Sequence, residues 1–350
     1  MRHCIQLASK AGGHASPNPM VGSVLVGNDR ILAEGYHHAA GEWHAERNAL
    51  MGFDGNPENT TLYVNLEPCC HHGKTPPCTD IIIEKKIPRV VVAMVDPFDR
   101  VAGKGIETLR KAGIEVVVGV EEGLAQELNR FFCLSIKENR PWVTLKAATT
   151  LDGRIASAFD ESKWITGEKA RLEGRVMRAD HDAILVGIGT VLADDPQLNA
   201  RGVPNAKDPK PIILDSTLRC PLKAAVFSSG QKPLIFCAME TPVIETFPAD
   251  IIAVNRLEQG LSIEEILANL HSQNIRSLLV EGGGIVHSQF INSGFVDAIE
   301  LFMAPTVLGG GRSWLQSLNY RLAEAPRYEV FDVKPCGNDF QVSLRRGEYV

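Results

Sequence analysis

Residues 67–78 read Glu67-Pro68-Cys69-Cys70-His71-His72-Gly73-Lys74-Thr75-Pro76-Pro77-Cys78, a loop sequence rich in Cys, His and Pro. An apolar run over Thr61–Leu66 before it predicts a strand, and Thr79–Lys86 after it predicts a helix. A further strand is expected over Arg89–Val95. Strand and helix alternate in this way through the first half of the chain. The alternation favours an α/β sandwich of helices around one sheet.

A His-x-Glu segment, His44-Ala45-Glu46, precedes this loop and indicates its chemistry. Zinc deaminases combine such a segment with two thiolates from a second one, so three protein ligands hold the metal and the fourth position carries water. Zinc lowers the pKa of that water to about 7, which yields hydroxide at neutral pH. In this chemistry His44 is a ligand, and Glu46 carries the proton from water to the ring nitrogen and the leaving amine.

The spacing of the cysteines leaves the other two ligands open. The usual signature is Pro-Cys-x-x-Cys, but the residue three positions after Cys69 is His72. Either Cys69 and Cys78 bind zinc across an eight-residue loop, or His72 replaces a thiolate, and Cys70 is a further candidate. A purely structural zinc site is the alternative to a catalytic one. Structural sites are usually closed by four protein ligands, so three ligands beside Glu46 favour catalysis.

Composition limits the class of protein. The chain has 350 residues, a length that favours two domains. It has 36 Lys and Arg against 42 Asp and Glu, a net charge of −6, so we expect no basic face for DNA or RNA. The longest apolar runs fall far short of the ~20 residues of a membrane span. The first residues lack the apolar core of a secretion signal. We therefore expect a cytoplasmic protein with reduced cysteines.

The segment Asn139-Arg140-Pro141 marks the expected boundary, and we assign residues 1–144 to a first domain and 145–350 to a second. In the first domain, one long helix is expected over Glu121–Lys137. The second domain is also α/β. Its expected strands are Trp142–Ala147, Ala183–Val186, Pro211–Leu214, Pro233–Cys237 and Ser277–Val280, and its expected helices are Glu168–Ala179, Ile263–His271 and Ile285–Ser293.

A glycine-rich turn, Val280-Glu281-Gly282-Gly283-Gly284, leads from one of these strands into a helix. Glycines let the backbone approach a ligand closely, and a helix N-terminus favours phosphate. The second domain has no Gly-x-Gly-x-x-Gly after its first strand, so a Rossmann dinucleotide site is not supported. The turn by itself is equally typical of an ordinary strand-to-helix connection.

The segments Pro17-Asn18-Pro19-Met20-Val21-Gly22, His44-Ala45-Glu46 and 67–78 closely resemble the bifunctional deaminase-reductase of riboflavin biosynthesis. That family has a long Cys-x8-Cys loop, so the resemblance implies that His44, Cys69 and Cys78 bind Zn²⁺. The family commonly has Ser after the first Cys, where this chain has Cys70, which we expect to be a bystander. The resemblance also implies that Asn18 binds a pyrimidine edge and that Lys74 binds a substrate phosphate, with help from His37 or His71.

Motifs of the second domain match the reductase half of the same family in order, so the resemblance spans nearly the whole chain. The matching segments are Lys146, Leu151-Asp152-Gly153-Arg154, 162–166, 189–196, Leu214-Asp215-Ser216, 281–284, Ala304-Pro305 and Leu308-Gly309-Gly310. The resemblance implies a dihydrofolate-reductase-like α/β fold, which binds NADPH without the usual Rossmann fingerprint. The first domain is expected to have the cytidine-deaminase-like α/β/α sandwich.

The family's functional residues carry over by matching motif. Those expected to face NADPH are Ala148, Trp164, Thr190, Asp194, Ser216 and the stretch 283–289, which includes Gly283 and Gly284. Those expected to face the ribose phosphate are Ser162, Arg178, Leu198, Arg201 and Glu281, with the two arginines as forked phosphate donors. The expected proton donor for ribose ring opening is Lys146 or Asp194. The alternatives are a core position for Trp164 and a solvated surface position for either arginine.

The activity implied by the resemblance is bifunctional. The first domain hydrolyses the 2-amino group of 2,5-diamino-6-ribosylamino-4(3H)-pyrimidinone 5′-phosphate. The second uses NADPH to reduce the ribosyl group, giving 5-amino-6-ribitylamino-pyrimidinedione 5′-phosphate. The expected partners are this small molecule and further copies of the chain, in a dimer or tetramer, with no nucleic acid or membrane.

Three other interpretations remain open at this point. A nucleobase or nucleic-acid deaminase would need a basic, aromatic-lined groove, which a net charge of −6 and 6% aromatic residues disfavour. The second domain could instead be a nucleotide-binding module without turnover. A zinc-stapled interaction protein would bind metal with no open coordination position.

Overall fold

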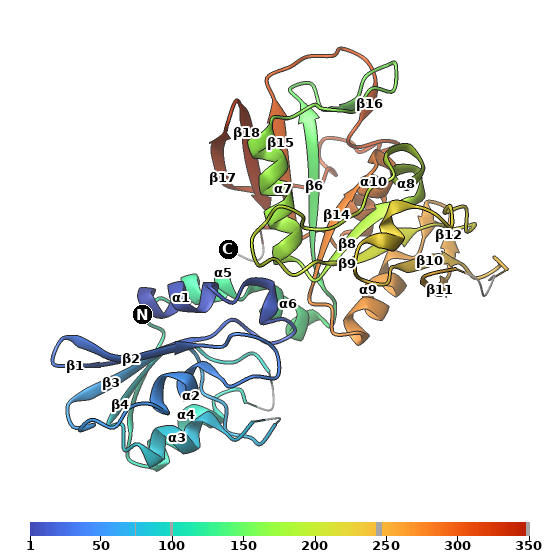
Figure 1. Cartoon of the computed structure of the whole chain (residues 1–350). Helices are drawn as coiled ribbons and strands as arrows, with labels where there is room; N and C mark the ends of the chain where they lie inside the picture. The colour runs from blue at the N-terminus through green and yellow to red at the C-terminus, as the bar shows by residue number, and fades with distance from the viewer. Residues whose placement is uncertain (74, 99–100, 243–246, 348–350) are drawn as a thin grey trace. The chain divides into compact units, whose positions relative to one another are not determined.

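The structure is a computed structural model that describes residues 1–73, 75–98, 101–242 and 247–347 (Figure 1). The chain divides into two compact units, Met1–Asn139 and Arg140–Val350. The division falls within the segment Asn139-Arg140-Pro141, whereas residue 144 lies inside the strand β6 (Trp142–Thr150). Within the described part of the chain, no helix is both long enough and apolar enough to cross a membrane.

The first unit has a five-stranded sheet in the order β2-β1-β3-β4-β5. Strand β1 pairs antiparallel with β2 and β3, and the pairs β3–β4 and β4–β5 are parallel. The register of the β1–β2 pair shifts between Leu25 and Val26. The strands are β1 (Gly22–Gly27), β2 (Arg30–Tyr36), β3 (Thr60–Leu66), β4 (Arg89–Met94) and β5 (Glu115–Val118).

Helices cover both faces of this sheet, which confirms the predicted α/β/α sandwich (Figure 1). The helices are α1 (Arg2–Ser9), the 3₁₀ turn η1 (Gly12–His14), α2 (Ala45–Leu50), α3 (Cys78–Glu84), α4 (Lys104–Lys111), α5 (Glu122–Leu128) and α6 (Arg130–Glu138). The fully buried Leu25, Leu50, Leu62 and Ile82 belong to the core between the sheet and one helix layer. Burial of this apolar surface holds α2, β3 and α3 in place, and the polar residues discussed below lie at the ends of these elements.

The single helix predicted over Glu121–Lys137 is wrong, because the chain forms two helices that meet at Asn129. The side chain of Asn129 accepts a hydrogen bond from the Met20 backbone N–H at 2.8 Å and donates one to the Met20 carbonyl at 3.0 Å. Asn129 is buried and has non-helical backbone angles, φ −100° and ψ 19°. This tertiary contact with the Pro-rich segment before β1 outweighs the helical pattern of the sequence.

The second unit has a nine-stranded sheet in the order β11-β10-β9-β8-β14-β6-β15-β18-β17. All neighbours from β11 to β15 are parallel, and β18 is antiparallel to both β15 and β17. The strands are β6, β8 (Ala183–Gly187), β9 (Lys210–Leu214), β10 (Leu234–Ala238), β11 (Asp250–Val254), β14 (Ser277–Gly282), β15 (Ala298–Ala304), β17 (Glu329–Cys336) and β18 (Asp339–Arg345). Strands β11, β15, β17 and β18 were not predicted from the sequence.

Four helices, a 3₁₀ turn and four short strands complete the described part of the second unit. They are the helices α7 (Glu168–Asp180), α8 (Ile188–Asp194), α9 (Ile263–Ser272) and α10 (Gly284–Ser293), the turn η2 (Ala225–Ser228), and the short strands β7 (Arg154–Ala156), β12 (Arg256–Leu257), β13 (Gly260–Leu261) and β16 (Arg312–Ser313). In β8, Leu185 packs in the cluster with α9 and α10, whereas Ile184 packs in the cluster with α8. Burial on both faces is typical of parallel sheets.

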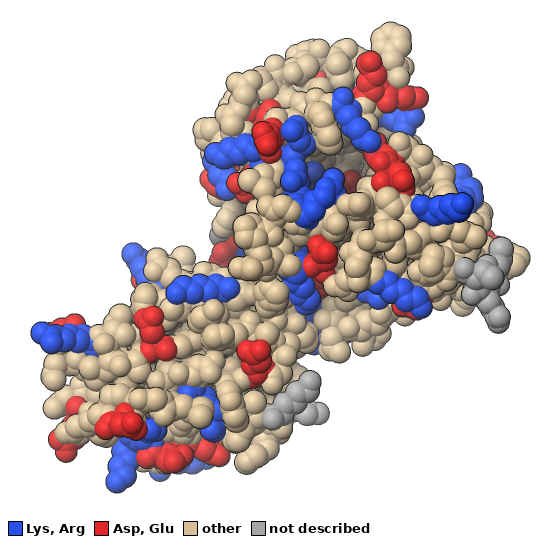
Figure 2. Space-filling model, viewed as in Figure 1, with Lys and Arg blue, Asp and Glu red and all other residues tan. Residues whose placement is uncertain are grey.

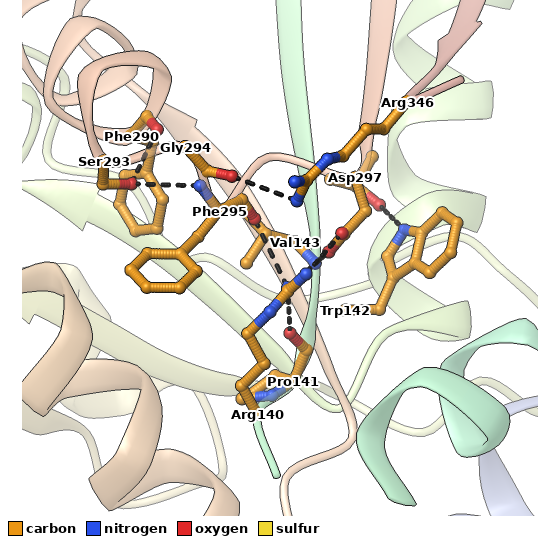
Figure 3. Close-up of polar contacts among 11 residues, drawn as sticks. Arg140, Pro141, Trp142, Val143, Phe290, Ser293, Gly294, Phe295, Asp297 and Arg346 are labelled. Carbon is orange, nitrogen blue, oxygen red and sulfur yellow. Dashed lines mark hydrogen bonds and ion pairs between the residues drawn. The ribbon is translucent and has the colours of Figure 1, made fainter. Parts of the chain in front are cut away.

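A buried ion pair anchors the start of the second unit (Figure 3). The Arg140 guanidinium donates to both carboxylate oxygens of Asp297 at 2.7 Å, and the Val143 N–H donates to the same carboxylate at 2.8 Å. The two side chains are 6% and 0% exposed. The pair therefore joins the first residues of β6 to the residue just before β15, in a geometry that satisfies both charges.

Replacing Asp297 with alanine leaves the Arg140 charge buried without its partner. We expect Asp297→Ala to lower the free energy of unfolding of the second unit by about 3–5 kcal/mol. Urea unfolding followed by tryptophan fluorescence measures this loss. Asp250→Ala is the matched control, since Asp250 and Lys232 form an exposed pair worth about 1 kcal/mol or less. Equal losses in the two variants would contradict this account.

Candidate functional site

His44, Cys69 and Cys78 converge at one point in the first unit, where their ligand atoms lie within 4.8 Å of one another. His44 directly precedes α2, Cys69 follows β3, and Cys78 is the first residue of α3. The His44 Nδ1 atom is 3.4 Å from each sulfur, and the Cys78 backbone N–H donates to the Cys69 sulfur at 3.3 Å. Among the described residues this is the one group of metal-ligating side chains so arranged.

The donor set and its spacing fit a zinc ion. With Zn–S of about 2.3 Å and Zn–N of about 2.0 Å, a tetrahedral ion holds its ligand atoms roughly 3.5 Å apart. The 3.4 Å between the imidazole nitrogen and each sulfur agrees with that spacing. Three ligands leave the fourth position of a tetrahedral site open, as in catalytic zinc sites. His72 and Cys70, the alternatives left by the sequence, are not in this group.

The charge states of the two thiols are linked. A hydrogen bond from Cys78, together with those from His44 and the Cys78 backbone, lowers the pKa of Cys69. The same contact raises the pKa of the buried Cys78 thiol. In the protein alone, this contact favours the thiolate form of Cys69, with the Cys78 thiol as its hydrogen-bond donor. This ready source of a thiolate suits a site for a soft cation.

Glu46 lies in the first turn of α2, two residues after His44, and is 3% exposed. Burial, reinforced by the negative charge of Cys69, raises the pKa of Glu46 to about 7. A carboxyl group with a pKa near the working pH both accepts and donates protons efficiently. The geometry therefore places a proton carrier beside the candidate metal site.

His37 and Asn18 are in contact with each other, and His37 packs against His44. The rings of His37 and His44 meet edge to face with centroids 5.5 Å apart. The His37 Nδ1 lies 3.1 Å from the Trp43 carbonyl, which only accepts, so Nδ1 carries the proton and Nε2 accepts from the Asn18 amide nitrogen at 3.1 Å. Asn18 therefore has its amide oxygen left for a ligand.

The other predicted residues of this site lie on the loop between the two cysteines. His71 is half-buried and outside the metal-ligating group, and His72 is exposed. Cys70 is also outside the group, and its pKa is raised by partial burial and by the charges of Glu67 and Cys69. Lys74, the predicted phosphate ligand, lies outside the described residues.

The second unit contains a cavity of about 1460 Å³ at the carboxyl ends of its parallel strands. Figure 2 shows this hollow with Lys and Arg side chains gathered around it. Ligands of open α/β sheets bind at such strand ends. Within the predicted stretch 283–289, Ser288 is not part of the cavity lining, and its hydroxyl donates to the Gly284 carbonyl. The other residues predicted for this unit line the cavity: Lys146, Ala148, Ser162, Trp164, Arg178, Thr190, Asp194, Leu198, Arg201, Ser216, Glu281, Gly283 and Gly284.

In this cavity the Glu281 carboxylate contacts two cationic side chains, Arg178 and Lys146. The Arg178 guanidinium donates to both of its oxygens at 2.8 Å, and the Lys146 Nζ lies 3.9 Å away. Burial opposes ionisation, but the charges of Arg178 and Lys146 outweigh it and hold the pKa of Glu281 at about 2. Burial, aided by the Arg178 charge, lowers the pKa of Lys146. The Glu281 charge opposes this shift without cancelling it.

The arginines of the cavity carry more positive charge than Glu281 balances. Arg178 uses three of its five N–H groups on Glu281 and the Asn199 carbonyl, so two remain for a ligand. Burial and the charges of Arg178 and Arg175 lower the pKa of Arg201. Arg175 lines the same cavity and was not among the residues predicted from the sequence. The sequence did contain an indication of this role. Arg175 precedes Arg178 by three residues in the predicted helix, and residues with that spacing lie on one helix face.

Two features shape the rest of the cavity. Trp164 is 69% exposed with the Arg171 guanidinium 4.6 Å from its ring centre, so it is a cavity side chain and not a core residue. Gly283 has φ +66°, and a Cβ on Gly284 would lie 2.4 Å from the Ser313 carbonyl oxygen. Only glycine fits this entry to α10. Residues 283–287 line the cavity there, and the free N–H groups of a helix N-terminus favour a phosphate.

Two family models match the chain. The family described as "Cytidine and deoxycytidylate deaminase zinc-binding region" matches residues 1–94, and "RibD C-terminal domain" matches residues 141–342. A riboflavin biosynthesis protein RibD from Aquifex aeolicus is 42% identical over 348 residues, which is 99% of this chain and 97% of that protein. The protein of the same name from Escherichia coli is 34% identical over 358 residues, 98% of each chain.

Solved structures of similar proteins have the same fold over the whole chain. A diaminohydroxyphosphoribosylaminopyrimidine deaminase/5-amino-6-(5-phosphoribosylamino)uracil reductase from Thermotoga maritima is 38% identical with a TM-score of 0.91, covering 99% of this chain and 97% of its own. Acinetobacter baumannii RibD is 36% identical with a TM-score of 0.90, covering 98% and 97%.

The low pKa of Glu281 gives the second unit an acid-dependent stability. Because that pKa falls from 4.5 to about 2 on folding, the stabilisation is present above pH 4.5 and is lost as the pH falls toward 2. We expect the free energy of unfolding to fall less steeply from pH 5 to pH 3 in Glu281→Gln than in the unchanged chain, as measured by urea unfolding. Glu258→Gln, at an exposed acid, is the control; identical slopes for all three proteins would refute the role of Glu281.

Proposed function

The chain belongs to the RibD family of bifunctional riboflavin biosynthesis enzymes, and on that premise we propose which residues of its two units carry each reaction. The first unit is a zinc-dependent deaminase and the second an NADPH-dependent reductase. The proposed substrate is 2,5-diamino-6-ribosylamino-4(3H)-pyrimidinone 5′-phosphate. It loses its 2-amino group to water in the first unit. Its ribosyl group is then reduced in the second, which gives 5-amino-6-ribitylamino-pyrimidinedione 5′-phosphate.

The observation that carries the deaminase assignment is the meeting of His44, Cys69 and Cys78 beside the buried carboxyl of Glu46. These three residues hold the zinc ion. Zinc supplies Lewis acidity, which lowers the pKa of water to about 7. Glu46 accepts the proton of the attacking water and delivers it to the ring nitrogen and the departing ammonia. In the protein alone, burial and the Cys69 charge raise the pKa of this carboxyl to about 7.

Recognition of the pyrimidine is assigned to Asn18, with Lys74 on the substrate phosphate. The Asn18 amide oxygen is left for a ligand because its nitrogen donates to His37. It accepts a hydrogen bond from a ring or amino N–H of the pyrimidine. His37 is buried and already engaged by Trp43 and Asn18, so it orients Asn18 and contributes no proton. The role of Lys74 rests on the family resemblance alone.

In the second unit, the cavity is proposed to hold NADPH beside the ribose phosphate. NADPH supplies the hydride. The residues assigned to it are Ala148, Trp164, Thr190, Asp194, Ser216, Gly283 and Gly284. Those assigned to the substrate are Ser162, Arg178, Leu198, Arg201 and Glu281. The positive charge of Arg178 and Arg201, joined by Arg175, supports a site for the phosphate dianion.

Two residues compete for the role of proton donor in ribose ring opening. Lys146 is largely buried, and burial lowers its pKa, so it gives up its proton more readily than a solvated lysine does. Asp194 lies 3.6 Å from the Lys163 Nζ and accepts a hydrogen bond from Ser162 at 3.4 Å. Both contacts engage the Asp194 carboxylate with neighbouring side chains, whereas the Lys146 ammonium lies beside the Glu281 carboxylate in the buried part of the cavity. We therefore assign proton donation to Lys146 and a cofactor contact to Asp194.

The assembly and location of the enzyme are inferred from the family. We propose that copies of this chain form a dimer or tetramer in the cytoplasm and act on a small molecule, not on nucleic acid. Light scattering from the purified chain measures the assembly directly. A monomer at micromolar concentration would contradict this part of the proposal.

Glu46→Gln removes the carboxyl that moves the proton and keeps its size. We expect the deamination rate to fall by about 10²–10⁴-fold, with zinc still bound and the reductase rate unchanged. Ammonia release, zinc content and NADPH oxidation are measured on the same preparation. Loss of zinc from this variant would show that Glu46 has a different role.

Lys146→Gln removes the proposed proton donor of the reductase. We expect kcat for NADPH oxidation to fall by about 10²–10⁴-fold, whereas Asp194→Asn should mainly raise the KM for NADPH. In the unchanged enzyme the reductase rate should decline on the alkaline side at a pH below the ordinary lysine pKa of about 10.4. Full kcat in Lys146→Gln would remove Lys146 from the mechanism. Deaminase activity of the same variants is the internal control.

A further inference from the structure

Glu67 is a buried acid that no step of the proposed reactions uses. It lies two residues before Cys69, and 3% of its surface is exposed. Its carboxylate accepts hydrogen bonds from four backbone N–H groups. One oxygen accepts from Gly105 at 2.8 Å and Ile106 at 3.2 Å, and the other from Gly103 at 2.9 Å and Asp96 at 3.2 Å.

These four donors belong to a different part of the chain, 29–39 residues further on. Three of them lie at the start of α4, where backbone N–H groups have no partner within the helix. A carboxylate at that position also complements the helix dipole. The fourth donor lies in the connection that follows β4. The Glu67 side chain therefore joins the end of β3 to the β4–α4 connection.

Backbone contacts hold the same short segment in place. The Glu67 N–H donates to the Met94 carbonyl at 3.0 Å, which extends the pairing of β3 with β4 by one residue. A Cβ on Gly105 would lie 2.0 Å from the Pro68 carbonyl oxygen, so α4 approaches the chain so closely that only glycine fits. Residues 67 and 68 are thus fixed on both sides, and the next residue is Cys69.

We propose that Glu67 is a positioning residue that sets the place of the Cys69 sulfur, and through it the affinity of the first unit for zinc. Cys69 begins the loop that leads to Cys78, so the position of its sulfur depends on where β3 ends. The Glu67 carboxylate fixes that end against α4 without touching the metal. This inference rests on the proposed ligand set of His44, Cys69 and Cys78.

Glu67→Gln removes the negative charge and one of the two acceptor oxygens while keeping the size of the side chain. A glutamine offers one acceptor oxygen, and its NH₂ group faces N–H donors where the second oxygen was. The chain ahead of Cys69 must then shift, and we expect zinc affinity to fall about 10–100-fold, as for residues that support metal ligands. Glu107→Gln is the matched control, since Glu107 is an exposed acid in the first turn of the same helix.

The measurement is the zinc dissociation constant of the full chain, by competition with a chromophoric chelator, alongside the absorption spectrum of the cobalt-substituted protein. Glu67→Gln should weaken zinc binding and alter the cobalt–thiolate bands, and Glu107→Gln should change neither. Reductase activity, which belongs to the other unit, should be unchanged in both. Gly105→Ala provides a second route to the same shift if Glu67→Gln does not fold.

Each outcome bears on a separate claim. An unchanged zinc affinity in Glu67→Gln with a lowered melting temperature would assign Glu67 a purely structural role and overturn the inference. Absence of cobalt–thiolate bands in the unchanged chain would overturn the ligand set itself, and the inference with it. Weakened zinc binding with altered bands, in Glu67→Gln and not in Glu107→Gln, is the result that supports the positioning role.

Discussion

The sulfur atoms of Cys69 and Cys78 both lie 3.4 Å from one imidazole nitrogen of His44, and the proposed chemistry of the first unit depends on this contact. The three residues come from the start of α2, the end of β3 and the start of α3. Each of those elements is held by the apolar core, so the positions of the ligand atoms are determined by packing at a distance from them. The same burial raises the pKa of Glu46 to about 7. The packed interior of the first unit therefore both positions the three ligand atoms and raises the pKa of the Glu46 carboxyl.

The second unit uses buried charge in two different ways. Arg140 and Asp297 form a closed pair, in which each charge meets its partner in the core. Glu281 instead faces Arg178 and Lys146, with further arginines nearby, so the cavity keeps an excess of positive charge. A closed pair holds two strands in register. The excess of positive charge in the cavity attracts an anion, as a phosphate substrate requires. Burial, aided by the Arg178 charge, lowers the pKa of Lys146, as a proton donor requires.

The sequence predicted the elements and sites that depend on local patterns, and it failed where distant contacts decide. The His-x-Glu segment and the cysteine spacing limited the metal ligands to a few residues, and the family resemblance selected among them. Strands β15 and β18 were missed because the buried Glu300 pairs with Arg345 at 3.0 Å, and buried polar residues break the apolar pattern of a strand. The break at Asn129 and the role of Glu67 depend on residues 109 and 29–39 positions away, which no local pattern records.

The most direct test of this account is a product mass spectrum. The zinc-loaded chain is incubated with the diaminopyrimidine ribosylamine phosphate, with and without NADPH. The account predicts replacement of one amino group by oxygen in both samples, and the addition of two hydrogens only where NADPH is present. Deamination without reduction in both samples would contradict the assignment of the second unit as a working reductase for this substrate. An unchanged substrate in both would contradict the substrate assignment itself.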